Sequence, residues 1–120
     1  MKTRTLRAAA MSVAAAPLLL MAVGAQAHAH LVKASPSANA AVPAPSALHL
    51  QFSERLEPKF SAATVMKADG AAVAASSKAS GKAIDVTPKS ALPPGGYMVM
   101  WHVVSADGHR MKGQYNFTVK

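Results

Sequence analysis

The sequence predicts an all-β protein, a Greek-key β-sandwich or barrel of about seven strands. Residues 48–52 and 115–119 alternate strictly between apolar and polar side chains, which is the period of a strand with one buried face. Glycine and proline turns separate several further short runs. Alanine-rich stretches occur, but none has a sustained helical period between helix caps. Packed sheets therefore explain the pattern better than helices do.

The expected strands follow one another along the chain with turn signals between them. An N-terminal strand leads into residues 35–46, whose proline and small residues favour turns and extended backbone. An Asp-Gly pair at 69–70 is typical of a hairpin turn, and a Ser-Gly pair at 80–81 marks another break. Residues 97–105 are apolar on both faces apart from His102, as in a strand inside the domain. After the N-terminal strand, strands are expected over residues 48–52, 62–67, 71–75, 82–87, 97–105 and 114–120.

Residues 1–27 have the features of a secretory signal peptide. The first seven residues contain three basic residues and no acid, an apolar run covers 11–23, and the small-x-small motif Ala-Gln-Ala ends at Ala27. The apolar run is shorter than the roughly 20 residues that a membrane-spanning helix needs. We therefore predict a periplasmic protein that is not embedded in a membrane, with one domain over residues 28–120 and His28 at its N-terminus.

A second cleavage motif keeps one alternative open. Ala27-His28-Ala29 also has the small-x-small pattern, so cleavage after Ala29 would make His30 the first residue instead. The two outcomes differ in which histidine carries the free α-amine.

Charge and cysteine content limit the possible partners. Without its first 27 residues the chain keeps ten of its 13 Lys and Arg residues and all five acids, a net charge of +5 with histidine neutral. These cations are scattered along the chain and form no basic stripe, so nucleic acid is not an expected partner. The chain has no cysteine, so a bound metal must be held by nitrogen, oxygen or methionine sulfur.

A histidine at the N-terminus offers two metal donors on one residue, because the α-amine and the imidazole Nδ1 can close a six-membered chelate ring. Such nitrogen donors suit Cu(II), which heads the affinity order of divalent first-row metals. Farther along the chain, Asp107 and His109 are two residues apart and can project to one side of extended backbone, while Gly108 lets that backbone bend. Together with His28 they would form a site of three nitrogens and one carboxylate oxygen. Taken alone, an Asp-Gly-His triplet is more often just a turn than a metal site.

These residues resemble the CopC family of periplasmic copper-binding proteins. The resemblance rests on the histidine-led start at 28–36, the Phe-Ser-Glu strand end at 52–54 and the Trp-x-Val-Val-Ser-x-Asp-Gly-His block at 101–109. It covers essentially the whole of residues 28–120.

The resemblance implies a Greek-key β-barrel, Ig-like or cupredoxin-like, that holds one Cu(II) ion in a histidine brace. The ligands it implies are the amine and imidazole of His28, the carboxylate of Asp107 and the imidazole of His109. Glu54 matches a glutamate near the family's site, and His30 is close enough in sequence to act as a hydrogen-bond partner or alternative ligand; both are candidates for an outer shell around the metal. The family also implies a membrane copper importer of the CopD type as a partner.

Some family members carry a methionine-rich loop that binds Cu(I) at a second site. The corresponding stretch here, residues 66–89, has one methionine and no histidine, so that site is not expected. Met98 and Met100 are expected to serve packing. His49 is expected on a polar strand face, and Trp101 is expected to anchor the core.

Three functions are compatible with these features. The favoured one is a copper carrier or buffer in copper resistance or homeostasis, which is not an enzyme. A histidine-brace copper oxygenase is disfavoured because 93 residues leave little room for a substrate platform, and Asp107 would fill a coordination position that oxygen needs. The third is a metal-free β-sandwich with an adhesive or structural role, in which the histidines are incidental.

Overall fold

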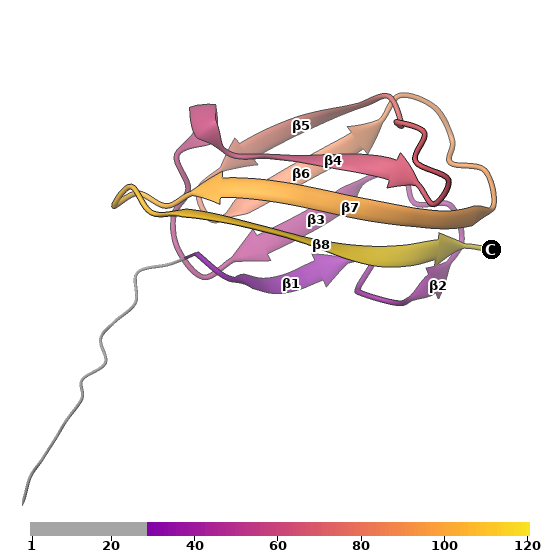
Figure 1. Cartoon of the computed structure of the whole chain (residues 1–120), viewed down its shortest axis with the longest axis horizontal. Coiled ribbons are helices and arrows are strands. Elements are labelled where there is room, and N and C mark those ends of the chain that lie inside the picture. Colours follow the sequence, from indigo (N-terminus) through magenta and orange to yellow (C-terminus); the bar gives the residue numbers. More distant parts are fainter. Residues whose placement is uncertain (1–28) are drawn as a thin grey trace, which may run out of the picture.

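The computed structural model describes residues 29–120, which form two packed β-sheets with a single short 3₁₀ turn among them (Figure 1). The predicted signal peptide over 1–27, and His28 itself, lie outside the described residues. The two-sheet architecture confirms the all-β fold class. Within the described residues, no helix has the length and apolar character needed to cross a membrane.

The two sheets each have four strands. One sheet has the order β1-β3-β6-β5 and the other has the order β2-β8-β7-β4. The longest pairing is the antiparallel β7–β8 hairpin, in which ten residue pairs run from Gly95↔Val119 to Val104↔Arg110. The elements are β1 Leu31–Ser35, β2 Ala41–Val42, β3 Leu48–Phe52, the 3₁₀ turn η1 Pro58–Phe60, β4 Ala62–Lys67, β5 Ala75–Ser80, β6 Ala83–Pro88, β7 Gly95–Val104 and β8 Arg110–Val119.

The core lies between the sheets and is built from the alternating apolar residues that the sequence predicted. The inward residues of β3 and of the second half of β8 are all buried, namely Leu48, Leu50, Phe52, Tyr115, Phe117 and Val119. Trp101 of β7 packs against this core, with its ring edge-on to Phe52 at a centroid distance of 5.1 Å. A Cβ at Gly113 would come within 2.4 Å of the Trp101 ring, so the indole requires a glycine on the neighbouring strand. Trp101 therefore packs against the core while remaining half-buried, which nearly matches its predicted role as a core anchor.

The strand boundaries differ from the prediction most in two regions. The last strand, expected over 114–120, begins earlier, as β8 Arg110–Val119, and the strands between residues 71 and 88 are placed differently. Strands were expected over 71–75 and 82–87, but the structure has β5 at Ala75–Ser80 and β6 at Ala83–Pro88, and the short β2 brings the number of strands in the described residues to eight. Ser80 pairs with Ala83, so the turn between these strands has only two residues. Such a tight turn brings the residues just before it into pairing with those just after it. The strand before the turn is therefore 75–80 and not 71–75. The Asp-Gly turn at 69–70 forms, but β4 and β5 belong to different sheets.

Several segments that are distant in sequence meet at one end of the sandwich. At this end β1 begins, β3 leads toward η1, and β7 turns into β8 (Figure 1). The Asp-Gly-His triplet therefore lies at the same end as the first described residues of the domain.

Candidate metal centre

The loop between β7 and β8 holds two of the predicted ligands on a tight turn. The Ser105 N–H donates to the His109 carbonyl at 2.9 Å, and the Gly108 N–H donates to the Ser105 carbonyl at 2.8 Å. Gly108 has a φ of 92°, a left-handed conformation that other residues rarely adopt. The predicted role of Gly108 as the bending point is therefore confirmed.

Asp107 and His109 contact each other directly. His109 Nδ1 lies 3.0 Å from Asp107 Oδ2, and the two side chains keep 53% and 41% of their surfaces exposed. Metal bonds of about 2.0–2.2 Å at right angles would place neighbouring donors about 2.8–3.1 Å apart, so the observed separation suits two adjacent ligands of one tetragonal ion. In the metal-free protein the same contact is an ion pair or hydrogen bond, which holds both groups in one orientation.

Ser105 supports this pair from beneath. Its side chain is buried, and its hydroxyl donates a short hydrogen bond to Asp107 Oδ1. The Ser105 hydroxyl, followed by the His109 ring, lowers the pKa of Asp107 to about 2. Asp107 is therefore a carboxylate at any physiological pH and needs to lose no proton before it binds a cation.

The strand end that contains Glu54 is attached to this loop. The Ala106 N–H donates to the Arg55 carbonyl at 2.9 Å, and the Glu57 N–H donates to the Val104 carbonyl at 2.8 Å. Glu54 is exposed and directly precedes Arg55 in the chain. It is one residue away from the segment that is hydrogen-bonded to the loop.

The start of the domain is fixed to the same strand end. The His30 N–H donates to Ser53 Oγ at 2.9 Å, and the Ser53 N–H donates to the His30 carbonyl at 2.9 Å. Ala29 is completely buried in the core cluster. The backbone on the carboxyl side of His28 is therefore anchored beside residues 53–55, which in turn contact the loop of Asp107 and His109.

The described residues contain only part of the predicted ligand set. Among residues 29–120, no group of three or more His, Cys, Asp or Glu side chains is arranged to hold a metal ion. Asp107 and His109 are brought together, whereas His28 lies outside the described residues. Of the remaining histidines, His30 lies at the start of the domain, hydrogen-bonded to Ser53. His49 pairs with Asp85 on the opposite sheet, and His102 is exposed on β7.

No role for Ser105 at this site was predicted from the sequence. A serine two positions before an aspartate in a turn can hydrogen-bond to it, and this local signal is present in the Ser-Ala-Asp-Gly order. The burial of Ser105 is a tertiary property, since it depends on the bridge between Ser105 and Leu56.

Comparison with known proteins identifies relatives over nearly all of the described chain. The CopC domain family model matches residues 31–120. Copper resistance protein C of Xanthomonas campestris pv. juglandis is 39% identical over an alignment of 123 residues. The alignment covers 95% of this chain and 97% of that protein. Protein YobA of Escherichia coli K12 is 43% identical over 99 residues, covering 78% of this chain and 80% of YobA.

The fold has close counterparts among solved structures. The crystal structure of PcoC, a methionine-rich copper resistance protein from Escherichia coli, superimposes with a TM-score of 0.73 at 40% identity and covers 78% of this chain and all of that chain. A family match over residues 31–120, full-length relatives and a shared fold lead to one conclusion. This chain belongs to the CopC family.

Proposed function

We propose that this protein is an exported copper carrier that binds one Cu(II) ion through His28, Asp107 and His109. In this proposal the first 27 residues are removed, and the new terminus supplies the α-amine and imidazole of His28. Membership of the CopC family supports copper as the cargo, since two of the relatives above are named copper resistance proteins.

The observation that carries the proposal is the meeting of the domain's start with the Asp107–His109 pair at one end of the sandwich. His30 is hydrogen-bonded to Ser53, and Arg55 is hydrogen-bonded to Ala106 of the loop. Ala29, the first residue that the structure describes, is completely buried at this anchored position. The anchoring of Ala29 and His30 beside the loop supports His28, which precedes them in the sequence, as the remaining ligand.

The donor set favours Cu(II) over other biological divalent ions. An amine, two imidazoles and one carboxylate are nitrogen-rich ligands, which suit the tetragonal geometry of Cu(II). Asp107 contributes a negative charge that the low pKa keeps in place. The α-amine has a pKa of about 7.7–8.0 in model peptides and must be deprotonated, so copper binding should weaken on acidification through this group and the imidazoles.

The exposure of the loop supports a carrier without catalytic turnover. Asp107 and His109 both keep roughly half of their side-chain surface open to solvent, so an acceptor can reach the ion without the domain opening. A periplasmic role with transfer to a membrane importer follows from the family resemblance. His30 and Glu54 would act around the ligands, by orienting one of them or a bound water.

The test is electron paramagnetic resonance of Cu(II) bound to the exported protein. We expect one equivalent of Cu(II) with nitrogen hyperfine coupling, and a large loss of affinity when a glycine precedes His28, since an amide nitrogen replaces the amine. Circular dichroism of the extended variant should be unchanged. Equal affinity with and without the glycine would exclude the terminal amine as a ligand.

The intact mass of the exported protein tests the position of cleavage. A mass that begins at His28 supports the proposal. A mass that begins at His30 would transfer the amine role to that residue, and an uncleaved chain would remove the amine ligand altogether.

A further inference from the structure

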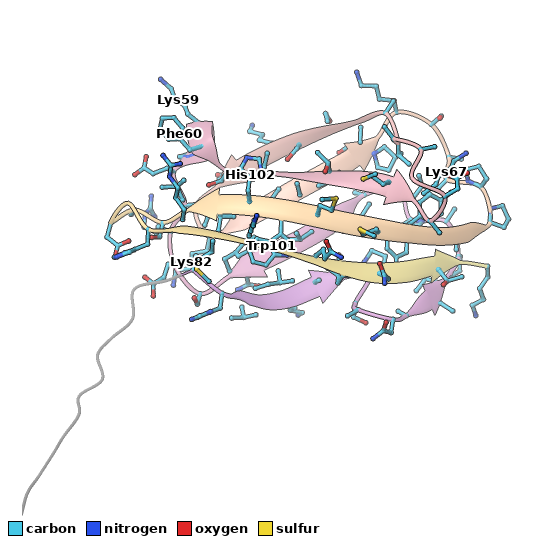
Figure 2. All side chains as sticks on the ribbon, in the orientation of Figure 1. Lys59, Phe60, Lys67, Lys82, Trp101 and His102 are labelled. Carbon is cyan, nitrogen blue, oxygen red and sulfur yellow. The ribbon has the colours of Figure 1, made fainter. Side chains whose placement is uncertain are left out.

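A groove adjoins the ligand loop on the outer face of the β7–β8 hairpin. It has a volume of about 710 Å³ and runs between the hairpin and η1. Figure 2 shows Lys59 and Phe60 of η1 on the same side of the molecule as His102 of β7. We call it the basic groove and define it by its lining residues Lys59, Phe60, His102, Val103, Val104, Gly108, Arg110, Met111 and Lys112.

Backbone hydrogen bonds hold the two walls of the basic groove in place. His102 is the cross-strand partner of Lys112, and Val104 is the partner of Arg110. On the other wall, the segments flanking η1 are bonded to β7, since the Val104 N–H donates to Ser61 Oγ at 3.0 Å and the Val104 carbonyl accepts from Glu57 at 2.8 Å. The backbone that forms the groove is therefore fixed before a partner binds, which limits the ordering cost to the exposed side chains.

The lining combines positive charge with an exposed aromatic ring. Lys59, Arg110 and Lys112 contribute three cations, and none of the five acidic residues of the chain lines the groove. Phe60 is 62% exposed, the largest exposed fraction among the big apolar side chains of the described residues. A cationic surface with an aromatic anchor is complementary to a chain that carries carboxylates and an apolar side chain.

The shape of this face favours an elongated partner over a small anion. A second hollow of about 460 Å³ shares His102 and Lys112 with the basic groove and continues along the outer face past Met100 and Gln114. No acidic residue lines this second hollow either. A free carboxylate ion would use the cations but would gain nothing from Phe60 or from the length of the surface.

One lining residue connects the groove to the metal centre. Gly108 lies between Asp107 and His109 in the chain, so a partner in the groove would lie beside both predicted ligands. We propose that the basic groove docks an acidic, apolar-anchored segment of the protein with which this carrier exchanges copper. This inference rests on the proposed function for its purpose, although the docking itself needs no metal.

The test measures peptide binding to the metal-free exported protein. The probe is a short blocked peptide of glutamate and leucine, with a counterpart that has glutamine at each glutamate. We expect saturable binding of the acidic peptide, with amide NMR shifts at η1 and the facing residues of β7 and β8. The charge-reversal variant K59E/K112E should bind at least about tenfold more weakly.

Matched control variants separate docking from simple attraction to a basic protein. Lys33 and Lys89 are exposed and do not line the groove, so K33E/K89E changes the net charge equally and should retain binding within about twofold. Val32 is 58% exposed, so Val32→Ser matches Phe60→Ser, and only the latter should weaken binding. Equal losses in the paired variants would overturn the proposal.

Two further measurements complete the design. Succinate producing the same shifts at a similar concentration would identify a small-anion site and overturn the choice of a protein segment. Cu(II) resonance spectra of the same variants distinguish the two proposals. A normal copper signal without peptide binding would refute only the docking surface, whereas peptide binding without a copper signal would refute only the copper site.

Discussion

The molecule contains two pairs of histidine and aspartate that have the same chemistry but different backbone settings. His49 Nδ1 lies 2.6 Å from Asp85 Oδ1, across the paired strands β3 and β6. His109 Nδ1 lies 3.0 Å from Asp107 Oδ2, within the loop between β7 and β8. Both pairs are substantially exposed, so neither exposure nor partner distinguishes them.

The surroundings of the two pairs are what differ. The loop pair has the buried Ser105 hydroxyl beneath it, a left-handed glycine between its members, and the anchored start of the domain nearby. The strand pair projects from the outer face of the other sheet, with Lys78 as the cross-strand neighbour of Asp85. An imidazole beside a carboxylate supplies only two donors, so the copper site we propose depends on further donors near the loop pair.

The largest expected difference between the pairs is in copper affinity after loss of the histidine. His109→Ala removes a proposed ligand, so the affinity for Cu(II) should fall by more than the about 10- to 100-fold typical of losing an outer partner. His49→Ala should leave it unchanged. Competition titration against a Cu(II) chelator measures both variants, and similar losses would mean that the loop pair is not the site.

Replacing the aspartates tests the second member of each pair. Asp107→Asn keeps the size of the side chain but removes the charge, so we expect about tenfold weaker Cu(II) binding and a changed resonance spectrum. Asp85→Asn is the matched control and should change neither. An Asp107→Asn spectrum identical to that of the unchanged protein would show that Asp107 orients His109 without coordinating the ion.

Ser105→Ala tests the support that only the loop pair has. Removing the hydroxyl takes away the main cause of the low pKa of Asp107, so this pKa should rise from about 2 toward 3.8. A depressed carboxyl pKa contributes stability that is complete above pH 3.8 and is lost as the pH falls toward 2. The free energy of unfolding of the variant should therefore depend less on pH in this range. Carboxyl-carbon NMR titration measures the shift.

The control for Ser105→Ala is Ser77, a serine whose hydroxyl is hydrogen-bonded elsewhere in the molecule. Ser77 Oγ, on β5 of the other sheet, accepts from the Ala63 N–H at 3.0 Å. Ser77→Ala should leave the titration of Asp107 as it was. An unchanged Asp107 titration in Ser105→Ala would show that the Ser105 hydroxyl does not set this pKa.

The smallest expected effect is the contribution of the strand pair to folding. Exposed ion pairs contribute about 0–1 kcal/mol, so His49→Ala should lower the free energy of unfolding by no more than about 1 kcal/mol in urea titrations. The loss should shrink further in high salt. A loss of several kcal/mol would mean that the strand pair is a structural element in its own right.

Local patterns in the sequence were sufficient for the fold class. The alternation of Leu48, Leu50 and Phe52, and of Tyr115, Phe117 and Val119, predicts two strands with buried faces, and all six residues are buried. The same patterns were insufficient for the stretch 71–80, where alanine and serine are equally compatible with strand and turn. There the tight turn after Ser80 determines which residues form the strand. The pairing of β5 with β6 determines the sheet to which β5 belongs.

Met98 and Met100 show the same limit at the level of single side chains. Their spacing placed them together on one face of a strand, with a packing role expected. The structure leaves Met98 half-buried and Met100 38% exposed on the outer face of β7, so their share in packing is smaller than the core residues'. A strand that is apolar on both faces does not reveal which face has a second sheet against it.

The sequence by itself determined the chemistry that is available to this protein: an all-β domain without cysteine, and a histidine, an aspartate and a second histidine suited to Cu(II). Only the tertiary structure brought residues 29–30, residues 53–57 and the 105–109 loop to one end, buried Ser105 beneath Asp107, and set η1 beside β7 to form the basic groove. The reason is that the contacts between these segments, including the bridge that buries Ser105 against Leu56, join residues 20 or more positions apart. A local pattern of side chains has no information about which distant strands will pair.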